Sequence, residues 1–249
     1  MKQVLLFILF LNLITGLKTM GQSIDSLERK AGERDTMKTM IVRTGPSVKT
    51  PFYKQMIIPA SLISYGFFAM GNDHLLSLDR HIKEEVWTEH LHSLTKADNY
   101  LQYAPGMAVY GLNAIGIKGK NKLLDRSLLY LLSSAMMTIT VQSLKRITRI
   151  ERPDSSSTKS FPSGHTATAF VAAEFLYQEY KERSAWYGIA GYAVASTVGY
   201  LRIYNNRHWF KDVIAGAGIG LGMTKFAYWL YPKIKKKLSN HHSAFLLYN

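Results

Sequence analysis

Cysteine is absent from the 249 residues, and acidic residues are few, with 17 Asp and Glu against 31 Lys and Arg. The lack of cysteine excludes disulfides, thiolate zinc sites, iron–sulfur clusters and a cysteine nucleophile. It leaves export from the cytoplasm open, because a chain of this length can bury a core without disulfides. The shortage of acids gives a formal charge of +14, which favours acidic partners: phosphates, anionic lipid or nucleic acid.

Low-complexity tracts and internal repeats are also missing. With 47% hydrophobic and 12% aromatic residues, the composition excludes a disordered chain. The mean hydropathy of −0.06 is low for a wholly membrane-embedded protein and high for a soluble one. Composition therefore leaves an anion-binding globular protein or a membrane protein.

The chain begins with the layout of a secretory signal. Lys2 precedes an apolar run over residues 4–17, and small or polar residues follow at 18–22. We predict a signal peptide at residues 1–21. The alternative is an uncleaved anchor helix, although a bilayer span needs about 20 apolar residues. Either reading indicates an exported, bacterial-type protein.

Six apolar segments with helical periodicity follow a polar, basic extension at residues 22–54. They cover residues 56–71, 101–117, 127–144, 166–180, 185–204 and 209–231. Strand-like alternation is scarce. The sequence predicts an all-α fold, a helical bundle of about six core helices within one domain at residues 55–232. A basic tail occupies residues 233–249.

We predict that this bundle is embedded in a membrane. Its segments are near the lower length limit for a span, so a soluble helical domain is the alternative. Basic clusters at residues 118–122, 181–183 and 233–237 would lie in the cytoplasm by the positive-inside rule, which puts residues 145–165 and 202–212 outside. Pro59 is expected to break the first segment, which makes that segment the best candidate for one that does not span.

Three stretches contain residues that could bind phosphate. Lys145, Arg152 and Arg202 could converge as three cations, enough to neutralise a phosphate and the charge that develops during its transfer. Residues 162–164 stand immediately before a predicted helix, whose first N–H groups would point at an anion. Gly164 would allow close approach of the backbone. Taken alone, the basic residues would be read as a stripe that contacts lipid headgroups.

Three further residues supply groups for acid–base and nucleophilic chemistry. His208 and Asp212 are four positions apart, so they share one face of a helix. A carboxylate there can hold one imidazole nitrogen as N–H and leave the other to attack phosphorus. His165 could protonate the leaving oxygen. A lone His–Asp pair at this spacing would more often be a surface contact, and only the combination favours catalysis.

Together these residues resemble the three motifs of the type 2 phosphatidic acid phosphatase superfamily, which includes bacterial class A acid phosphatases and vanadium haloperoxidases. The family pattern is Lys-x6-Arg-Pro, then Pro-Ser-Gly-His, then Ser-Arg-x5-His-x3-Asp. The matching residues are Lys145, Arg152, Pro153, Pro162, Ser163, Gly164, His165, Arg202, His208 and Asp212. Leu201 departs from the pattern, because the family usually has Ser there. The resemblance covers roughly residues 56–231.

The resemblance implies a phosphohistidine mechanism without a metal or other cofactor. It makes His208 the nucleophile, Asp212 its partner and His165 the general acid. The phosphate-binding residues would be Lys145, Arg152, Ser163, Gly164 and Arg202. The expected substrate is a lipid phosphate or diphosphate: lipid A phosphate, undecaprenyl diphosphate, phosphatidylglycerophosphate or phosphatidic acid. The expected location is the inner membrane of a bacterial cell envelope, with the site facing the periplasm.

Three other functions are compatible with parts of the sequence. The first is a soluble periplasmic acid phosphatase of broad specificity. The second is a vanadate-dependent haloperoxidase, which the short chain disfavours. The third is a non-catalytic adaptor that binds anionic lipid, against which the intact His165, His208 and Asp212 argue. The expected partners are the phosphorylated lipid substrate and anionic membrane lipid at residues 233–237. Nucleic acid is not expected, because no binding motif accompanies the charge.

Two remaining patterns receive structural interpretations. Gly216, Gly218, Gly220 and Gly222 follow no strand, so they predict close helix packing instead of a dinucleotide site. His74, His81, His90 and His92 fit no standard metal spacing and are expected at the surface. Asp98 and residues 100–103 are hypothesised to border the active site.

Overall fold

The computed structural model describes residues 50–88 and 93–247, with side chains as far as residue 237. The predicted signal, residues 22–49 of the predicted extension, and His90 and His92 lie outside the described residues. Within them every regular element is a helix, which confirms the all-α prediction. The helices are α2 (Phe52–Phe68), α3 (Asp73–Lys83), the π-helical η2 (Glu84–Thr88), α4 (Ala97–Leu101), α5 (Ala104–Ala114), α6 (Leu123–Thr148), α7 (Gly164–Tyr180), α8 (Ala185–Tyr204) and α9 (Phe210–Leu247).

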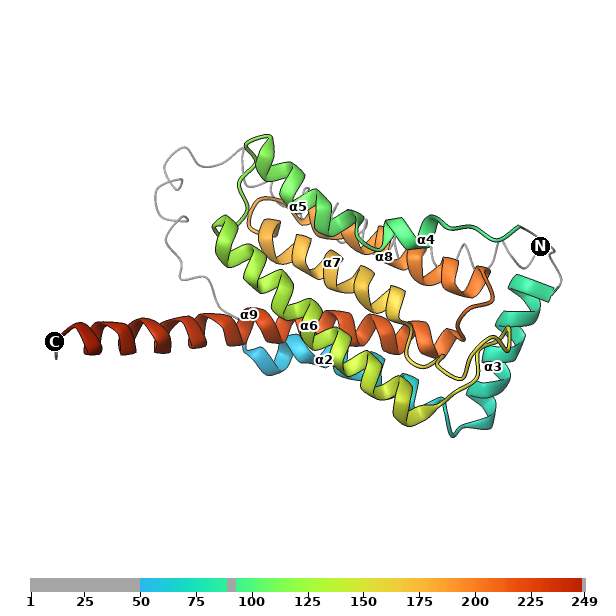
Figure 1. Ribbon diagram of the computed structural model, residues 1–249. Helices are drawn as coiled ribbons and strands as arrows, with labels where there is room; N and C mark the ends of the chain where they lie inside the picture. The colour runs from blue at the N-terminus through green and yellow to red at the C-terminus, as the bar shows by residue number, and fades with distance from the viewer. Residues whose placement is uncertain (1–49, 89–92, 248–249) are drawn as a thin grey trace, which may run out of the picture. The chain divides into compact units, whose positions relative to one another are not determined.

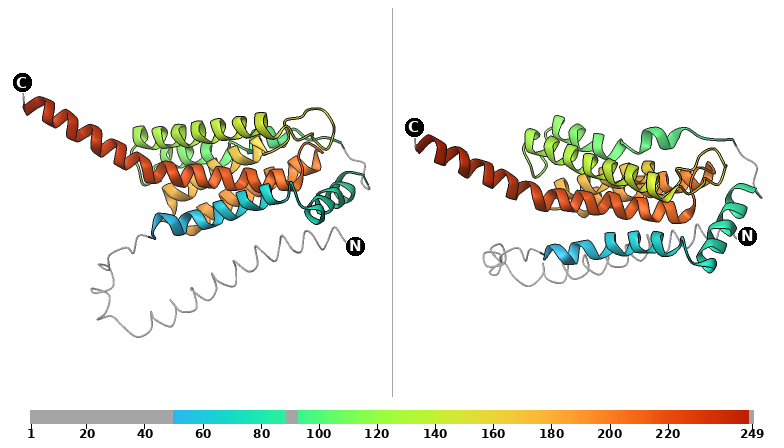
Figure 2. Two further views of the ribbon diagram at one scale, coloured as in Figure 1. Left: turned by 90° about the horizontal axis from the view of Figure 1, so that it is seen from below. Right: turned by 60° about the horizontal axis from the view of Figure 1, so that its bottom comes forward.

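The four helices that adjoin the predicted motifs alternate in direction (Figure 1). α6 runs toward one end of the bundle, α7 returns from that end, α8 runs back to it and α9 leaves from it. The loops at residues 149–163 and 205–209 therefore lie at the same end of the bundle. We call this the catalytic end. Figure 2 shows α2 beside α9, with α3 turning across the catalytic end.

α7 is the central helix, with buried residues on every side of it. Three hydrophobic clusters join it to its neighbours: Met137, Val141 and Ile219 surround Val171; Val109 packs against Phe175; Ala195 and Val198 pack against Ala169 and Ala173. α5, α6, α8 and α9 thus pack around one helix. This packing fixes the position of α7 along the bundle, so that α7 begins beside the end of α6, the end of α8 and the start of α9.

The glycines of α9 let this helix approach α7 and α2 closely. A Cβ at Gly216 or Gly220 would lie 2.6 Å from the carbonyl oxygen of Ser163 or 2.4 Å from that of Ala167, both at or in α7. A Cβ at Gly218 would lie 2.8 Å from the carbonyl oxygen of Pro59 in α2. Such distances leave no room for a side chain. The prediction of close helix packing is therefore confirmed.

The basic segments predicted to share one side of a membrane do lie together, at the end opposite the catalytic end. The Arg183 guanidinium donates to the carbonyl of Lys118 at 2.6 Å, and Lys120 pairs with Glu182. Lys235 of α9 pairs with Asp125 at the start of α6. The linker between α5 and α6 is thus held to the linker between α7 and α8, and α9 is held to the start of α6.

α2 corrects the expectation that Pro59 breaks the first apolar segment. The helix runs without interruption from Phe52 to Phe68 with Pro59 inside it and buried. The packing of α2 against α9 therefore outweighs the proline's missing N–H. Among the described residues, α6 and the Phe210–Lys237 part of α9 are the two helices long and apolar enough to cross a membrane. One face of α6 exposes apolar side chains along its whole length: Leu124, Leu128, Leu131, Ile139 and Ile147.

Candidate active site

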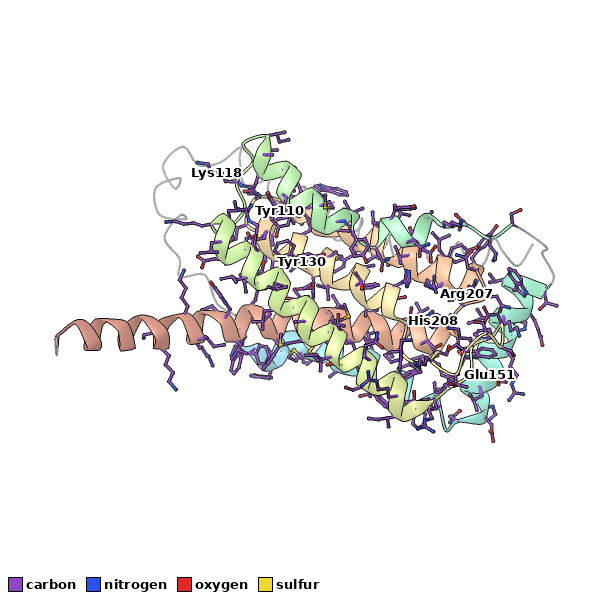
Figure 3. All side chains as sticks on the ribbon, in the orientation of Figure 1. Tyr110, Lys118, Tyr130, Glu151, Arg207 and His208 are labelled. Atoms are coloured by element: carbon purple, nitrogen blue, oxygen red, sulfur yellow. The ribbon has the colours of Figure 1, made fainter. Side chains whose placement is uncertain are left out.

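The three motif stretches meet at the catalytic end. Figure 3 shows His208, Arg207 and Glu151 there, with Lys118 and Tyr110 toward the other end. Two contacts tie the first and third stretches together. The Arg207 guanidinium pairs with Asp154 at 2.8 Å, and the Trp209 indole N–H donates to the carbonyl of Glu151 at 2.8 Å. The loops at residues 149–163 and 205–209 are therefore joined to each other at the catalytic end.

A tight turn between α8 and α9 brings His208 back to Arg202. The N–H groups of Arg207 and His208 both donate to the carbonyl of Arg202, at 3.0 Å and 3.3 Å. Asn206 takes the left-handed conformation that this turn requires, with φ of 56°. The spacing of five residues between Arg202 and His208 is thus the number that this turn needs to bring the two residues together. His208 is buried, and its Nδ1 lies 3.3 Å from Asp212 Oδ2.

Asp212 is fully buried, and one of its two carboxylate oxygens makes all of the side chain's hydrogen bonds. Oδ2 faces His208 and also accepts from the Ser160 hydroxyl at 2.5 Å and the Trp209 N–H at 3.0 Å. Oδ1 is buried without a hydrogen-bond partner. With a proton on Nδ1, His208 would donate to Oδ2. Among the described residues none bonds to its Nε2, which leaves that nitrogen for another atom.

The second motif forms the start of α7 beside this pair. Ser163 caps the helix, with its hydroxyl accepting from the Thr166 N–H and sharing a 2.8 Å hydrogen bond with the Thr166 hydroxyl. Its own N–H donates to the carbonyl of Asp212 at 2.9 Å. A Cβ at Gly164 would meet only Val141, at 3.8 Å, so space remains beside the first free N–H groups of α7. The start of α7 and the start of α9 are therefore joined directly.

Lys145, Arg152 and Arg202 all lie near enough to His165 for their charges to lower the pKa of its ring. Lys145 Nζ donates to two backbone carbonyls, at Lys159 and Ser160, and has no carboxylate partner among the described residues. The Nε atoms of Arg152 and Arg202 are buried and unpaired. Three cations with unmet hydrogen-bonding capacity thus surround the same space.

Arg202 already has one anionic partner. Asp98 of α4 is buried and pairs with its Nη1. Asn205 holds the same segment, since its side-chain amide exchanges hydrogen bonds with the backbone of Thr95, at 3.0 Å and 2.9 Å. Asp98 was hypothesised to border the site, and it contacts a motif residue directly. The guanidinium is therefore fixed on one edge while its Nε edge remains available.

The two histidines are shifted toward their neutral forms. Burial, opposed by the hydrogen bond that His208 donates to Asp212, lowers the pKa of His208 to about 4. Burial and the charge of Arg202 lower the pKa of His165 to about 4. His165 Nε2 lies 2.9 Å from the side-chain oxygen of Asn99. Neutral His208 suits a nucleophile, and an anion placed among the three cations would raise the pKa of His165.

Several contacts that surround the site have no signal in the local sequence. Ser160 and Asn99 contact catalytic-motif residues across 52 and 66 positions. Lys211 donates its backbone N–H and its ammonium to Asp79 of α3, 132 positions away. The position of Lys211, next to Asp212 at the start of an apolar helical segment, is the one sequence feature that could have prompted a search for an acidic partner of this lysine. Within the described residues no three His, Asp or Glu side chains cluster as metal ligands would.

Known proteins resemble this chain over the same region. The PAP2 superfamily model matches residues 126–236. The lipid A 1-phosphatase of Porphyromonas gingivalis is 37% identical over 186 residues, which are 74% of this chain and 39% of that protein. The bacitracin transport permease protein BcrC of Bacillus licheniformis is 35% identical over 75 residues, 30% of this chain and 35% of that protein. The chain thus spans less than half the length of these relatives.

A solved structure has the same helical arrangement. The transmembrane PAP2 type phosphatidylglycerolphosphate phosphatase from Bacillus subtilis superposes with a TM-score of 0.53 at 25% identity, over 71% of this chain and 96% of that one. The matched family region includes all three motif stretches. The resemblance stated from the motifs is confirmed, and residues 126–236 of this chain belong to the PAP2 superfamily.

Proposed function

We propose that this protein is a metal-independent phosphatase that removes a phosphate from a lipid phosphate through a phosphohistidine intermediate. The carrying observation is the convergence of the His208–Asp212 pair with Lys145, Arg152 and Arg202 at one end of an apolar bundle. Cations whose donor atoms are buried and unpaired are costly unless an anion accepts hydrogen bonds from them. Phosphate fits that requirement, with the N–H groups at the start of α7 as further donors.

The reaction would take two steps. His208 Nε2 attacks phosphorus, the bond to the leaving oxygen breaks, and His165 gives that oxygen its proton. Water then attacks the phosphohistidine while neutral His165 accepts a proton, and phosphate leaves His208. Asp212 holds the Nδ1 proton and stabilises the positive charge that the ring acquires. The three cations stabilise the equatorial oxygens in both steps.

A lipid substrate and a membrane location are supported by the bundle's surface. The outward face of α6 exposes leucines and isoleucines from its first turn to its last, which would be unfavourable in water. An apolar cavity of about 450 Å³ lies between α2, α6 and α9, with Ile63, Ile139 and Phe226 among its lining residues. The basic segments lie at the end opposite the catalytic end. By the positive-inside rule they favour a cytoplasmic position for the basic end, which places the site at the periplasmic face.

Among lipid phosphates, the phosphate monoester of lipid A is the substrate class we propose first. The lipid A 1-phosphatase of P. gingivalis is 37% identical to this chain over 74% of its length. Undecaprenyl diphosphate, phosphatidylglycerophosphate and phosphatidic acid are the comparison substrates, and p-nitrophenyl phosphate tests for an acid phosphatase of broad specificity.

Phosphate release by the full chain in detergent with EDTA tests the proposal. Wild type should release phosphate from lipid A fastest, and His208→Ala should release none. His74→Ala, at an exposed histidine in α3, is the matched control and should behave as wild type. Denatured wild type quenched during turnover should contain acid-labile, alkali-stable phosphate that is absent from His208→Ala. Activity in His208→Ala, or loss of wild-type activity with EDTA, would refute the mechanism.

A further inference from the structure

A buried ion pair joins α3 to the start of α9, immediately beside the catalytic pair. The ammonium of Lys211 lies 2.5 Å from Asp79 Oδ2, and the Lys211 N–H donates to Asp79 Oδ1 at 3.1 Å. The two side chains are 5% and 3% exposed. Lys211 Nζ also lies 5.2 Å from the centre of the Trp209 ring. The pair belongs to none of the three motif patterns.

The position of Lys211 gives its charge a consequence for catalysis. It directly precedes Asp212 in the chain, and the charge of Asp212 also acts on Asp79. Asp212 Oδ1 is buried without a hydrogen-bond partner. A buried ammonium needs an anion. Without Asp79, the Lys211 ammonium would be drawn to the carboxylate that orients His208.

We propose that Asp79 is a positioning residue, which holds the Lys211 ammonium so that the Asp212 carboxylate remains with His208. The proposal rests on the function proposed for His208 and Asp212. The two members of the pair then have opposite effects on catalysis. Unpaired, the Lys211 ammonium would compete with His208 for the Asp212 carboxylate, and Asp79 prevents this by pairing with it. An ion pair with a purely structural role would be equally harmed by loss of either partner.

Three variants of the full chain distinguish these roles. Asp79→Asn keeps an oxygen for the Lys211 N–H but removes the charge. It should lower kcat at least about tenfold and leave KM within about threefold of wild type, because the lost interaction orients the nucleophile. Lys211→Met removes the competing charge. It should retain kcat within about threefold, since burial raises the pKa of Asp79 and favours its neutral form.

The double variant Asp79→Asn/Lys211→Met should regain most of the activity that Asp79→Asn loses. Equal losses in Asp79→Asn and Lys211→Met, wild-type activity in Asp79→Asn, or a double variant no better than Asp79→Asn would overturn the proposal. If Asp79→Asn does not fold, activity in both Lys211→Met and the double variant supports the proposal, and loss in either overturns it.

Two controls separate this test from neighbouring explanations. Lys225→Met removes a half-buried lysine, which pairs with Glu174 at 2.7 Å in the bundle and away from the catalytic end. It should lower the melting temperature without changing kcat of the folded protein. His208→Ala must be inactive in the same assay. If it is active, the proposed function has failed, whatever the Asp79 variants show.

Discussion

The Ser160 hydroxyl and the His208 imidazole meet at the same oxygen of Asp212. Ser160 Oγ lies 2.5 Å from Asp212 Oδ2, and His208 Nδ1 lies 3.3 Å from it. Ser160 follows the first motif and precedes the second, so a residue between motifs holds the carboxylate of the third. The hydroxyl limits rotation of the carboxylate about its Cβ–Cγ bond.

We expect Ser160→Ala to lower kcat about tenfold, because a hydrogen bond to a charged group contributes about 1.5–3 kcal/mol and here orients the nucleophile's partner. Steady-state phosphate release measures it. Ser133→Ala is the control: Ser133 is equally buried but donates to Leu129 in its own helix, α6. If both variants lower kcat equally, Ser160 has no specific link to Asp212.

Asp98→Asn should tighten inhibition by inorganic phosphate about fivefold. Asn still accepts a hydrogen bond from Arg202, but the site loses one negative charge, which is worth about 1 kcal/mol for an incoming anion. Competitive inhibition constants measure the effect. Asp154→Asn alters the more exposed pair with Arg207 and should change the constant less. Weaker inhibition in Asp98→Asn would mean that its charge, not just its shape, positions Arg202.

Stability should fall as the pH is lowered from 6.5 toward 4. The ordinary pKa of histidine is 6.5, and the pKa of His208 in the folded protein is about 4. Because the folded pKa is the lower of the two, the folded protein favours the neutral ring. That contribution is complete above pH 6.5 and is lost as the pH falls through about 4. Melting temperatures in detergent should show a smaller acid-induced decrease in His208→Asn than in wild type. His74→Asn should keep the wild-type decrease; an unchanged profile in His208→Asn would contradict the prediction.

Gly220→Ala and Gly222→Ala should differ in their effect on stability, although the two glycines are only two positions apart on α9. A Cβ at Gly220 would lie 2.4 Å from the carbonyl oxygen of Ala167, whereas one at Gly222 would lie 3.4 Å from the Pro59 Cβ. We expect Gly220→Ala to cost about 1–3 kcal/mol of stability through backbone displacement, and Gly222→Ala to be nearly neutral. Thermal melting of both proteins checks this. Equal melting temperatures would show that α7 and α9 separate without cost.

The helices and the motif residues were predictable because their signals are local. Apolar residues at helical spacing predicted α2 and α5–α9, although the segment at residues 101–117 contains the end of α4, a break and then α5. The spacing of four residues predicted that His208 and Asp212 would share a helix face, and their side chains lie 3.3 Å apart. The continuity of α2 was not predictable, because it depends on packing against α9 at Pro59, which no local pattern records.

The supporting contacts could not be predicted, because they join residues that are distant in the chain and ordinary in type. Asp79, Asn99 and Ser160 contribute one carboxylate, one amide and one hydroxyl. Each stands in a sequence context where a solvated side chain would be equally reasonable. Their roles depend on how α3, α4 and the loop between α6 and α7 pack at the catalytic end, which is a property of the tertiary structure.

The glycine contacts of α9 have a consequence for the active site's dimensions. Gly216 meets Ser163 and Gly220 meets Ala167, so each contact lies one helical turn further along two parallel helices. Ser163 begins the turn that we propose binds phosphate, and Asp212 lies one turn before Gly216. The separation between that turn and the start of α9, next to the proposed nucleophile, is therefore set by contacts between the two helix backbones, which no rotamer change can alter. The site is preorganised by its scaffold, so the dipoles that face phosphate need little rearrangement when charge develops on it.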